Sequence, residues 1–224
     1  MKQLTMVLVG VFLSVGTLYA QDDDLGSGGS LDGGDLLIEI TASPFNGDGW
    51  GDQLLHFGAF RARYAVTDVL VPRLGVTMDL NNTQSTPDEV LTYGQYEVMP
   101  GLEYHLRIDG AFRSYAALDL IFGQRNVSLE SSTGSSVDGA SEVPTSANYN
   151  FSDRGFLRYG VNLGFGAEYH LGSRFYIGTE IGFKLYQDNM VEVMVDGEKF
   201  QDSVKDSYAK LNTMNAIRIG FKLL

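Results

Sequence analysis

The sequence predicts an all-β protein, an eight-stranded antiparallel up-and-down transmembrane β-barrel with an N-terminal signal peptide. Three observations lead to this prediction. Apolar and polar residues alternate over unusually long stretches. The expected connections between these stretches are short and long in turn. The first residues have the features of a secretion signal.

The clearest alternation runs through residues 157–186 and is interrupted by the turn Gly172-Ser173. Apolar residues occupy the odd positions, while charged residues and glycines fill most of the even ones. Because a strand sends successive side chains to opposite faces, each of the two strands has one apolar and one polar face. Strands of this length exceed the usual 5–6 residues of soluble proteins and are typical of membrane barrels.

Residues 1–20 are expected to be a cleaved signal peptide. Lys2 supplies the positive start, residues 6–15 form the apolar core and Ala20 precedes the expected cleavage point. The core is too short for a stable helical anchor, and no later apolar run approaches the roughly 20 residues of a spanning helix.

Residues 21–34 are rich in Asp, Gly and Ser and predict a flexible acidic linker, so that the barrel is expected over 35–224. The chain has no cysteine, which excludes disulfides and thiolate metal ligands. Its net charge of −12 disfavours nucleic acid as a partner, because nucleic-acid binding depends on clustered Lys and Arg.

The first three strands are expected at 35–45, 53–66 and 69–80, where apolar residues again alternate with polar ones. A glycine-rich connection, residues 46–52, separates the first two strands. The dipeptide Thr67-Asp68 predicts a tight turn between the second and the third.

Residues 81–92 are polar and predict a loop. The fourth and fifth strands are expected at 93–107 and 113–126, joined by a turn at Asp109-Gly110. Pro100 lies inside the fourth strand and cannot donate a ladder hydrogen bond, so we expect a β-bulge at Pro100-Gly101.

Two long polar connections, 127–153 and 188–209, enclose the sixth and seventh strands, and an eighth strand is expected at 217–223. The seven connections span about 7, 2, 12, 5, 27, 2 and 22 residues, so every even-numbered one is short, as in a barrel with short periplasmic turns and longer outer loops. This parity predicts that both mature termini lie in the periplasm.

The polar faces decide which way the barrel is turned. They carry charges of both signs and many glycines. The glycines would weaken a water-exposed strand, but inside a narrow barrel they leave room for long arginine side chains. Charges inside a barrel must be paired, so we expect a structural interior network. Its members are Arg61, Arg63, Arg73, Glu97, Glu103, Arg107, Asp119, Arg158, Glu168, Glu180, Lys184 and Arg218.

The opposite faces are nearly free of charge and are expected to meet lipid. Aromatic residues lie towards the strand ends, as interfacial girdles require. They are Tyr64, Tyr96, Tyr104, Tyr159, Tyr169 and Phe175.

On these features, with the signal segment and the terminal Arg218-Ile219-Gly220-Phe221-Lys222-Leu223-Leu224, the chain resembles small outer-membrane β-barrel proteins of the OmpA-transmembrane-domain and OmpX class. The terminal stretch is similar to the assembly signal of such barrels, although it ends in Leu224 instead of an aromatic residue. The resemblance implies a Gram-negative outer membrane, contact with its lipid, and assembly by the barrel-insertion machinery.

No catalytic, metal or cofactor motif is recognised. The three histidines, His56, His105 and His170, are too dispersed for a metal site, and His105 and His170 are expected to point inward near the periplasmic end. The sequence therefore favours a structural or interaction role without enzymatic activity. A narrow channel for small solutes and a lipid-modifying enzyme stay open as alternatives.

The outer loops are the expected place of any interaction, since binding residues concentrate on loops held by a rigid scaffold. Loops 127–153 and 188–209 are therefore expected to contact an envelope protein, or to make the chain a subunit of a larger complex. Within the second loop, residues 190–195 alternate again and predict a short strand. That strand is expected either to form a hairpin with its own loop or to offer an edge to a partner.

Overall fold

The computed structural model describes residues 31–42, 57–143, 153–212 and 217–223. Within these ranges the chain forms a single antiparallel sheet that closes on itself. No helix in the described ranges is long and apolar enough to cross a membrane. The predicted signal peptide, His56 and the glycine-rich connection 46–52 lie outside the described residues.

The wall of the barrel has eight strand positions. β11 and β12 lie end to end along β8 and share one position, and three short strands lie beyond the end of β7, outside the wall. The wall strands are β1 (Leu36–Ala42), β2 (Phe57–Tyr64), β3 (Leu70–Thr86), β4 (Glu89–Asp109), β5 (Phe112–Ser131), β7 (Phe156–Leu171), β8 (Phe175–Met190) and β11 (Val204–Asn212) with β12 (Ile217–Lys222). The short strands are β6 (Val137–Asp138), β9 (Val193–Val195) and β10 (Glu198–Gln201).

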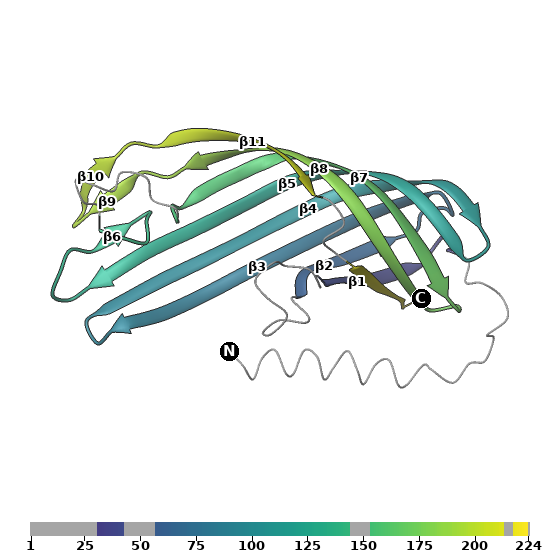
Figure 1. Ribbon diagram of the computed structural model, residues 1–224, viewed down its shortest axis with the longest axis horizontal. Helices are drawn as coiled ribbons and strands as arrows, with labels where there is room; N and C mark the ends of the chain where they lie inside the picture. The colour runs from purple at the N-terminus through teal and green to yellow at the C-terminus, as the bar shows by residue number, and fades with distance from the viewer. Residues whose placement is uncertain (1–30, 43–56, 144–152, 213–216, 224) are drawn as a thin grey trace.

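The barrel closes between its first and last strands. β1 pairs with β2 on one side and with β12 on the other, where Ile40 lies opposite Ile219. The eight-stranded antiparallel barrel is therefore confirmed, and strands that follow each other in the chain lie side by side around the wall (Figure 1).

The two ends of the barrel differ. At the short-turn end, β4 passes to β5 through Gly110 and Ala111, and β7 passes to β8 through residues 172–174. Gly110 and Gly172 have φ values of 58° and 84°, a left-handed conformation that glycine adopts without strain, which confirms these two predicted turns. At the other end, here called the extended end, β3, β4 and β5 run on together as a long curved sheet (Figure 1).

The expected loops at the extended end are largely strand. β3 and β4 pair through most of the predicted loop 81–92 and leave only Pro87 and Asp88 as a turn. Parts of 127–153 and 188–209 likewise form the end of β5, β6, β9, β10 and much of β11. The sequence does not reveal these strands by alternation of apolar and polar residues, because both of their faces meet polar surroundings. Their backbones still pair, since ladder hydrogen bonds need no apolar side chain.

The bulge predicted at Pro100-Gly101 is wrong. Val98 pairs with Phe122 and Gly101 with Asp119, so the register with β5 is the same on both sides of Pro100. Residues 99 and 100 form no pairs in the β4–β5 ladder, so the N–H that proline lacks is not required there as a hydrogen-bond donor. A register shift occurs instead between His105 and Arg107.

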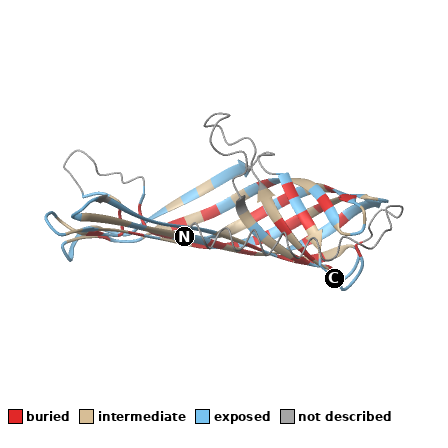
Figure 2. Cartoon of the chain, turned by 90° about the horizontal axis from the view of Figure 1, so that it is seen from below, coloured by how far each residue is buried: buried red, intermediate tan, exposed pale blue. Residues whose placement is uncertain are grey.

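The outer wall of the barrel is apolar, as predicted, and the residues that alternate with it are buried (Figure 2). Tyr169 and Tyr159 are 51% and 39% exposed and lie ten residues apart on β7, near the two ends of the apolar surface. A rise of about 3.4 Å per residue and a tilt of roughly 40° convert this spacing to about 25 Å, the height of the apolar band of membrane barrels. The apolar face therefore meets lipid.

The last residues of the predicted linker are part of the barrel. Leu31 is buried against Leu37, Val71 and Tyr176 at the short-turn end. Gly34 donates a backbone hydrogen bond to the Ala65 carbonyl, 2.7 Å away. Residues 31–34 are thus folded across the barrel mouth, which a reading of their composition alone does not reveal.

Candidate functional site

The interior network is centred on carboxylates that each receive several arginines. Glu39, on β1, lies opposite Arg61 in the β1–β2 ladder and accepts a hydrogen bond from its Nη1 at 3.1 Å. Arg218, on β12, donates to both oxygens of the same carboxylate, with Nε 2.7 Å from Oε1. The Tyr176 hydroxyl donates a further bond at 2.9 Å, so Glu39 ties together the strands on both sides of the barrel seam.

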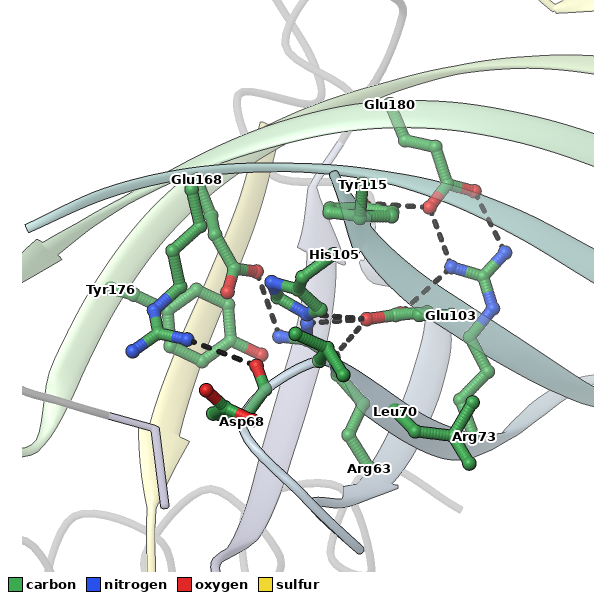
Figure 3. A network of polar contacts seen from close by, with 12 residues as sticks. Arg63, Asp68, Leu70, Arg73, Glu103, His105, Tyr115, Glu168, Tyr176 and Glu180 are labelled. Atoms are coloured by element: carbon green, nitrogen blue, oxygen red, sulfur yellow. Dashed lines mark hydrogen bonds and ion pairs between the residues drawn. The ribbon is translucent and has the colours of Figure 1, made fainter. Parts of the chain in front are cut away.

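Arg63 and Arg73 connect the middle of the interior (Figure 3). Arg63 donates from Nε to Glu103 at 3.0 Å, and its Nη1 lies 2.9 Å from Glu168. Arg73 donates from Nη1 to Glu103 at 2.8 Å. It also forms a two-pronged pair with Asp119, in which both N–O distances are 2.6 Å. Such paired geometry is typical of the strongest arginine–carboxylate contacts.

Glu180 completes this network from β8. It accepts a hydrogen bond from Arg73 at 2.7 Å, from the Tyr115 hydroxyl at 2.8 Å and from Arg218 at 3.2 Å. Its partners come from β3, β5 and β12, so one carboxylate links strands on different sides of the barrel. The interior is crossed by side chains at this level.

A second cluster lies nearer the extended end. Arg158 forms a two-pronged pair with Asp188 at 2.7 and 2.8 Å and reaches Glu97 at 3.3 Å. Lys184 lies 3.5 Å from the same glutamate. The Arg158 guanidinium is also 4.2 Å from the centre of the Tyr186 ring, a distance at which cation–π attraction adds to the ion pairs.

The structure brings most of the predicted network residues together. The first network contains Arg61, Arg63, Arg73, Glu103, Asp119, Glu168, Glu180 and Arg218, and the second cluster contains Glu97, Arg158 and Lys184.

Arg107 is the exception among the predicted members. Its side chain is 69% exposed and pairs with Asp109 at 2.7 Å outside the barrel. The register shift after His105 breaks the simple odd–even alternation that placed Arg107 inside.

The glycines of the inner face make room mainly for tyrosines and an aspartate, and not for arginines as the sequence suggested. A Cβ at Gly166 would lie 2.1 Å from the Tyr115 hydroxyl, and one at Gly220 would lie 1.9 Å from the Tyr176 ring. Both tyrosines donate to network carboxylates. The glycines therefore position the network through the tyrosines.

Sequence reasoning left Arg113, Tyr176 and Asp188 out of the network. All three follow the parity of inward neighbours, so strict use of the two-residue period would have included them. Arg113 is 2% exposed and lies opposite Glu168 in the β5–β7 ladder.

With Arg113 included, the part of the inner network that the structure describes holds equal numbers of cations and anions. The cations are Arg61, Arg63, Arg73, Arg113 and Arg218, and the anions are Glu39, Glu103, Asp119, Glu168 and Glu180. The interior at this level is therefore balanced in charge, as burial requires.

His105 and His170 are buried near the short-turn end, where they were predicted. His105 packs against Tyr115 and His170 stacks on Tyr176, with ring centres 5.6 and 5.3 Å apart. Each ring lies beside a glutamate already bound to arginine. In the described part of the chain, no group of three histidine, cysteine, aspartate or glutamate side chains could hold a metal ion.

The extended end is held together by Arg154. Its guanidinium donates to the Val191 carbonyl at 2.9 Å and to the Asp202 carbonyl at 2.5 Å. Below it, Val137, Ala140 and Val193 form a small buried cluster. β9 pairs with β10 and also with β6, so the predicted strand at 190–195 forms a hairpin within its own loop, the first of its two expected arrangements.

Comparison with known proteins finds structural likeness alone. No family model and no curated protein sequence matches the chain. The outer membrane protein OprG of Pseudomonas aeruginosa has 12% identity and a TM-score of 0.48, over 88% of this chain and 99% of that one. The N-terminal β-barrel domain of P. aeruginosa OprF has 12% identity and a TM-score of 0.45, over 86% and 100%. Ail, the attachment invasion locus protein of Yersinia pestis, has 12% identity and a TM-score of 0.39, over 86% and 100%.

The chain's own geometry defines its class. An apolar outer wall, aromatic residues near both ends of that wall and a paired charged interior describe a transmembrane β-barrel of the outer-membrane type.

Proposed function

We propose that the protein is an interaction protein of the Gram-negative outer membrane, which presents the extended end of its barrel to an envelope protein or surface ligand. The short-turn end and both mature termini face the periplasm in this proposal. The observation that supports it most is the continuity of β3, β4 and β5 from the lipid-facing wall into the extended sheet. A sheet anchored in this way holds its surface rigidly and lowers the entropy lost on binding.

The interior supports the same role. Three carboxylates hold Arg73 in place from β4, β5 and β8, so solute passage would require breaking several buried ion pairs. The proposal therefore gives the barrel no transport role. It also gives the chain no catalytic role, since the buried histidines pack on tyrosines beside arginine-bound glutamates.

Site-specific photocrosslinking in intact cells tests this proposal. A photoreactive residue at Glu198, on β10, is expected to give a discrete adduct with an envelope protein or a surface component. The matched control places the same group at Asp109, at the short-turn end. A chain that gives no adduct at the extended end, and conducts ions stably in planar bilayers, would contradict the proposal.

A further inference from the structure

The outward face of the barrel changes character sharply at the extended end of the apolar band. On β5 the exposed Phe122 is followed on the same face by Gln124, Asn126 and Ser128. On β8, Leu185 is followed by Gln187 and Asn189. Two separate strands thus exchange apolar residues for amides within a single outward step.

The same change occurs on β3, β4 and β11. β7, between β5 and β8, instead keeps the exposed Leu157 opposite both Gln124 and Asn189. We call the resulting two patches of uncharged polar residues, which β7 separates, the amide collar. It consists of Asn82 and Gln84 on β3, Thr92 on β4, Gln124, Asn126 and Ser128 on β5, Gln187 and Asn189 on β8, and Ser207 on β11.

The amide collar is joined to the aromatic residues at the edge of the band. The Tyr96 hydroxyl donates to Gln124 at 2.5 Å, and Gln124 donates to Asn126 at 2.8 Å. On the other side, Asn189 donates to the Tyr159 hydroxyl at 2.9 Å. These bonds hold the collar at the level where a lipid chain ends and its headgroup begins.

The residues of the collar are themselves uncharged. Along the described outward faces of β5 and β11, the first charged residues beyond the band are Glu130 and Lys205, which border the collar, and Lys205 lies opposite Asn189. The opposite edge of the band differs, since Arg107 and Asp109 are both exposed there. The two membrane interfaces of the barrel are therefore chemically distinct.

This chemistry selects a type of lipid. Phosphate groups are bound by arginine and lysine, which supply charge-assisted donors. Amides and hydroxyls both donate and accept hydrogen bonds without charge, and so match the hydroxyl groups of sugars. We propose that the amide collar binds the uncharged sugar headgroups of glycolipids in the surrounding leaflet. The inference rests on the proposed function only in assigning this leaflet to the outer surface.

Lipid competition on the purified, folded full chain tests the inference. Digalactosyl diacylglycerol and phosphatidylglycerol with the same acyl chains are added in equal amounts, and the lipids retained by the protein are measured by native mass spectrometry. The galactolipid is expected to be retained preferentially. Equal retention, or preference for phosphatidylglycerol, would overturn the inference without any variant being made.

Two variants sharpen the test. Asn126→Ala with Gln187→Ala should weaken galactolipid retention about tenfold, because several uncharged hydrogen bonds are lost. The control, Asn81→Ala with Gln95→Ala, changes the same residue types on the inward face and should retain the lipid as the unchanged chain does. Asn126→Arg with Gln187→Arg should shift the preference to phosphatidylglycerol.

Each variant is first checked for folding by its heat-dependent migration on a denaturing gel. If the alanine pair retains galactolipid fully, the collar is not the binding surface and the inference is wrong. Because no partner protein is present, a failure of the crosslinking experiment above would leave this result unaffected.

Discussion

Arg73 and Asp119 bind each other across an intervening strand. Arg73, on β3, pairs with Gly101 of β4, and Gly101 pairs in turn with Asp119 of β5. The two charged side chains meet over this glycine, with two hydrogen bonds of 2.6 Å. A Cβ at position 101 would lie 2.0 Å from Asp119 Oδ1 and 2.7 Å from the Leu118 carbonyl oxygen.

Gly101→Ala is therefore expected to destabilise the barrel by about 1–3 kcal/mol, the usual cost of forcing an extra carbon into a packed interior. Urea unfolding in lipid vesicles measures this change. Gly94→Ala is the matched control on the same strand, because its Cβ would meet only the flexible end of Leu80 at 3.3 Å. Equal effects of the two substitutions would show that the space over Gly101 has no special role.

Arg73→Ala should destabilise the barrel by about 3–5 kcal/mol, since it leaves buried carboxylates without their cation. Adding Asp119→Asn should recover part of the loss, because one of the stranded charges is then removed. Arg107→Ala removes an exposed arginine and should change the unfolding free energy by less than about 0.5 kcal/mol. Comparable losses for Arg73 and Arg107 would mean that burial of the network does not govern stability.

Arg154→Ala should loosen the extended end while leaving the barrel intact. The substitution removes the donors to the Val191 and Asp202 carbonyls, which connect the start of β9 to the end of β10. Backbone amides of β9 and β10 are expected to exchange with deuterium faster, whereas those of β7 keep their protection. Lys199→Ala, which removes only exposed ion pairs, is the control.

Leu31→Ala tests whether the folded residues at the barrel mouth contribute to stability. Leu31 is 1% exposed, and its truncation should cost about 2–4 kcal/mol in unfolding free energy through lost burial and the cavity left behind. Leu171→Ala, at the lipid-facing end of β7, provides a control with the same chemical change at a site that is 58% exposed. A smaller effect at Leu31 than at Leu171 would argue against a packed mouth.

The turn between β9 and β10 should respond to pH. The pKa of Asp196 is lowered by hydrogen bonds from the Ser135 side chain and from the Ser136 backbone N–H, which lies 2.8 Å away. A carboxyl group with a lowered folded pKa stabilises the fold above its ordinary value of 3.8, and this contribution is lost as the pH falls through the folded value. Amide exchange of β9 should therefore rise below pH 4 relative to β7, and Asp196→Asn should abolish the difference.

Sequence reasoning predicted the barrel well because lipid outside and paired charge inside impose a strict two-residue period from Leu157 to Leu185. It failed where that contrast disappears. Beyond the membrane both faces of β3 and β4 are polar, so the residues from Asn81 to Thr92 resembled a loop although their backbones pair.

The partners within the network were harder to predict than its members. Parity places Arg73 and Asp119 inside, but their contact depends on the stagger of three strands and on the absence of a side chain at Gly101. The misplacement of Arg107 has a similar origin, since a single extra residue in one strand reverses the faces that follow it.

The seam between β1 and β12 has a consequence for assembly. Glu39 and Arg218 are separated by 179 positions in the chain and bind each other directly. During synthesis and insertion, the ion pair of Glu39 with Arg218 can form only after nearly the whole polypeptide has been made. Closure is therefore expected to be the last and most cooperative step, because contacts between distant residues form only after the intervening chain is ordered. A barrel truncated before Arg218 would leave the Glu39 carboxylate without its main counter-charge at the seam.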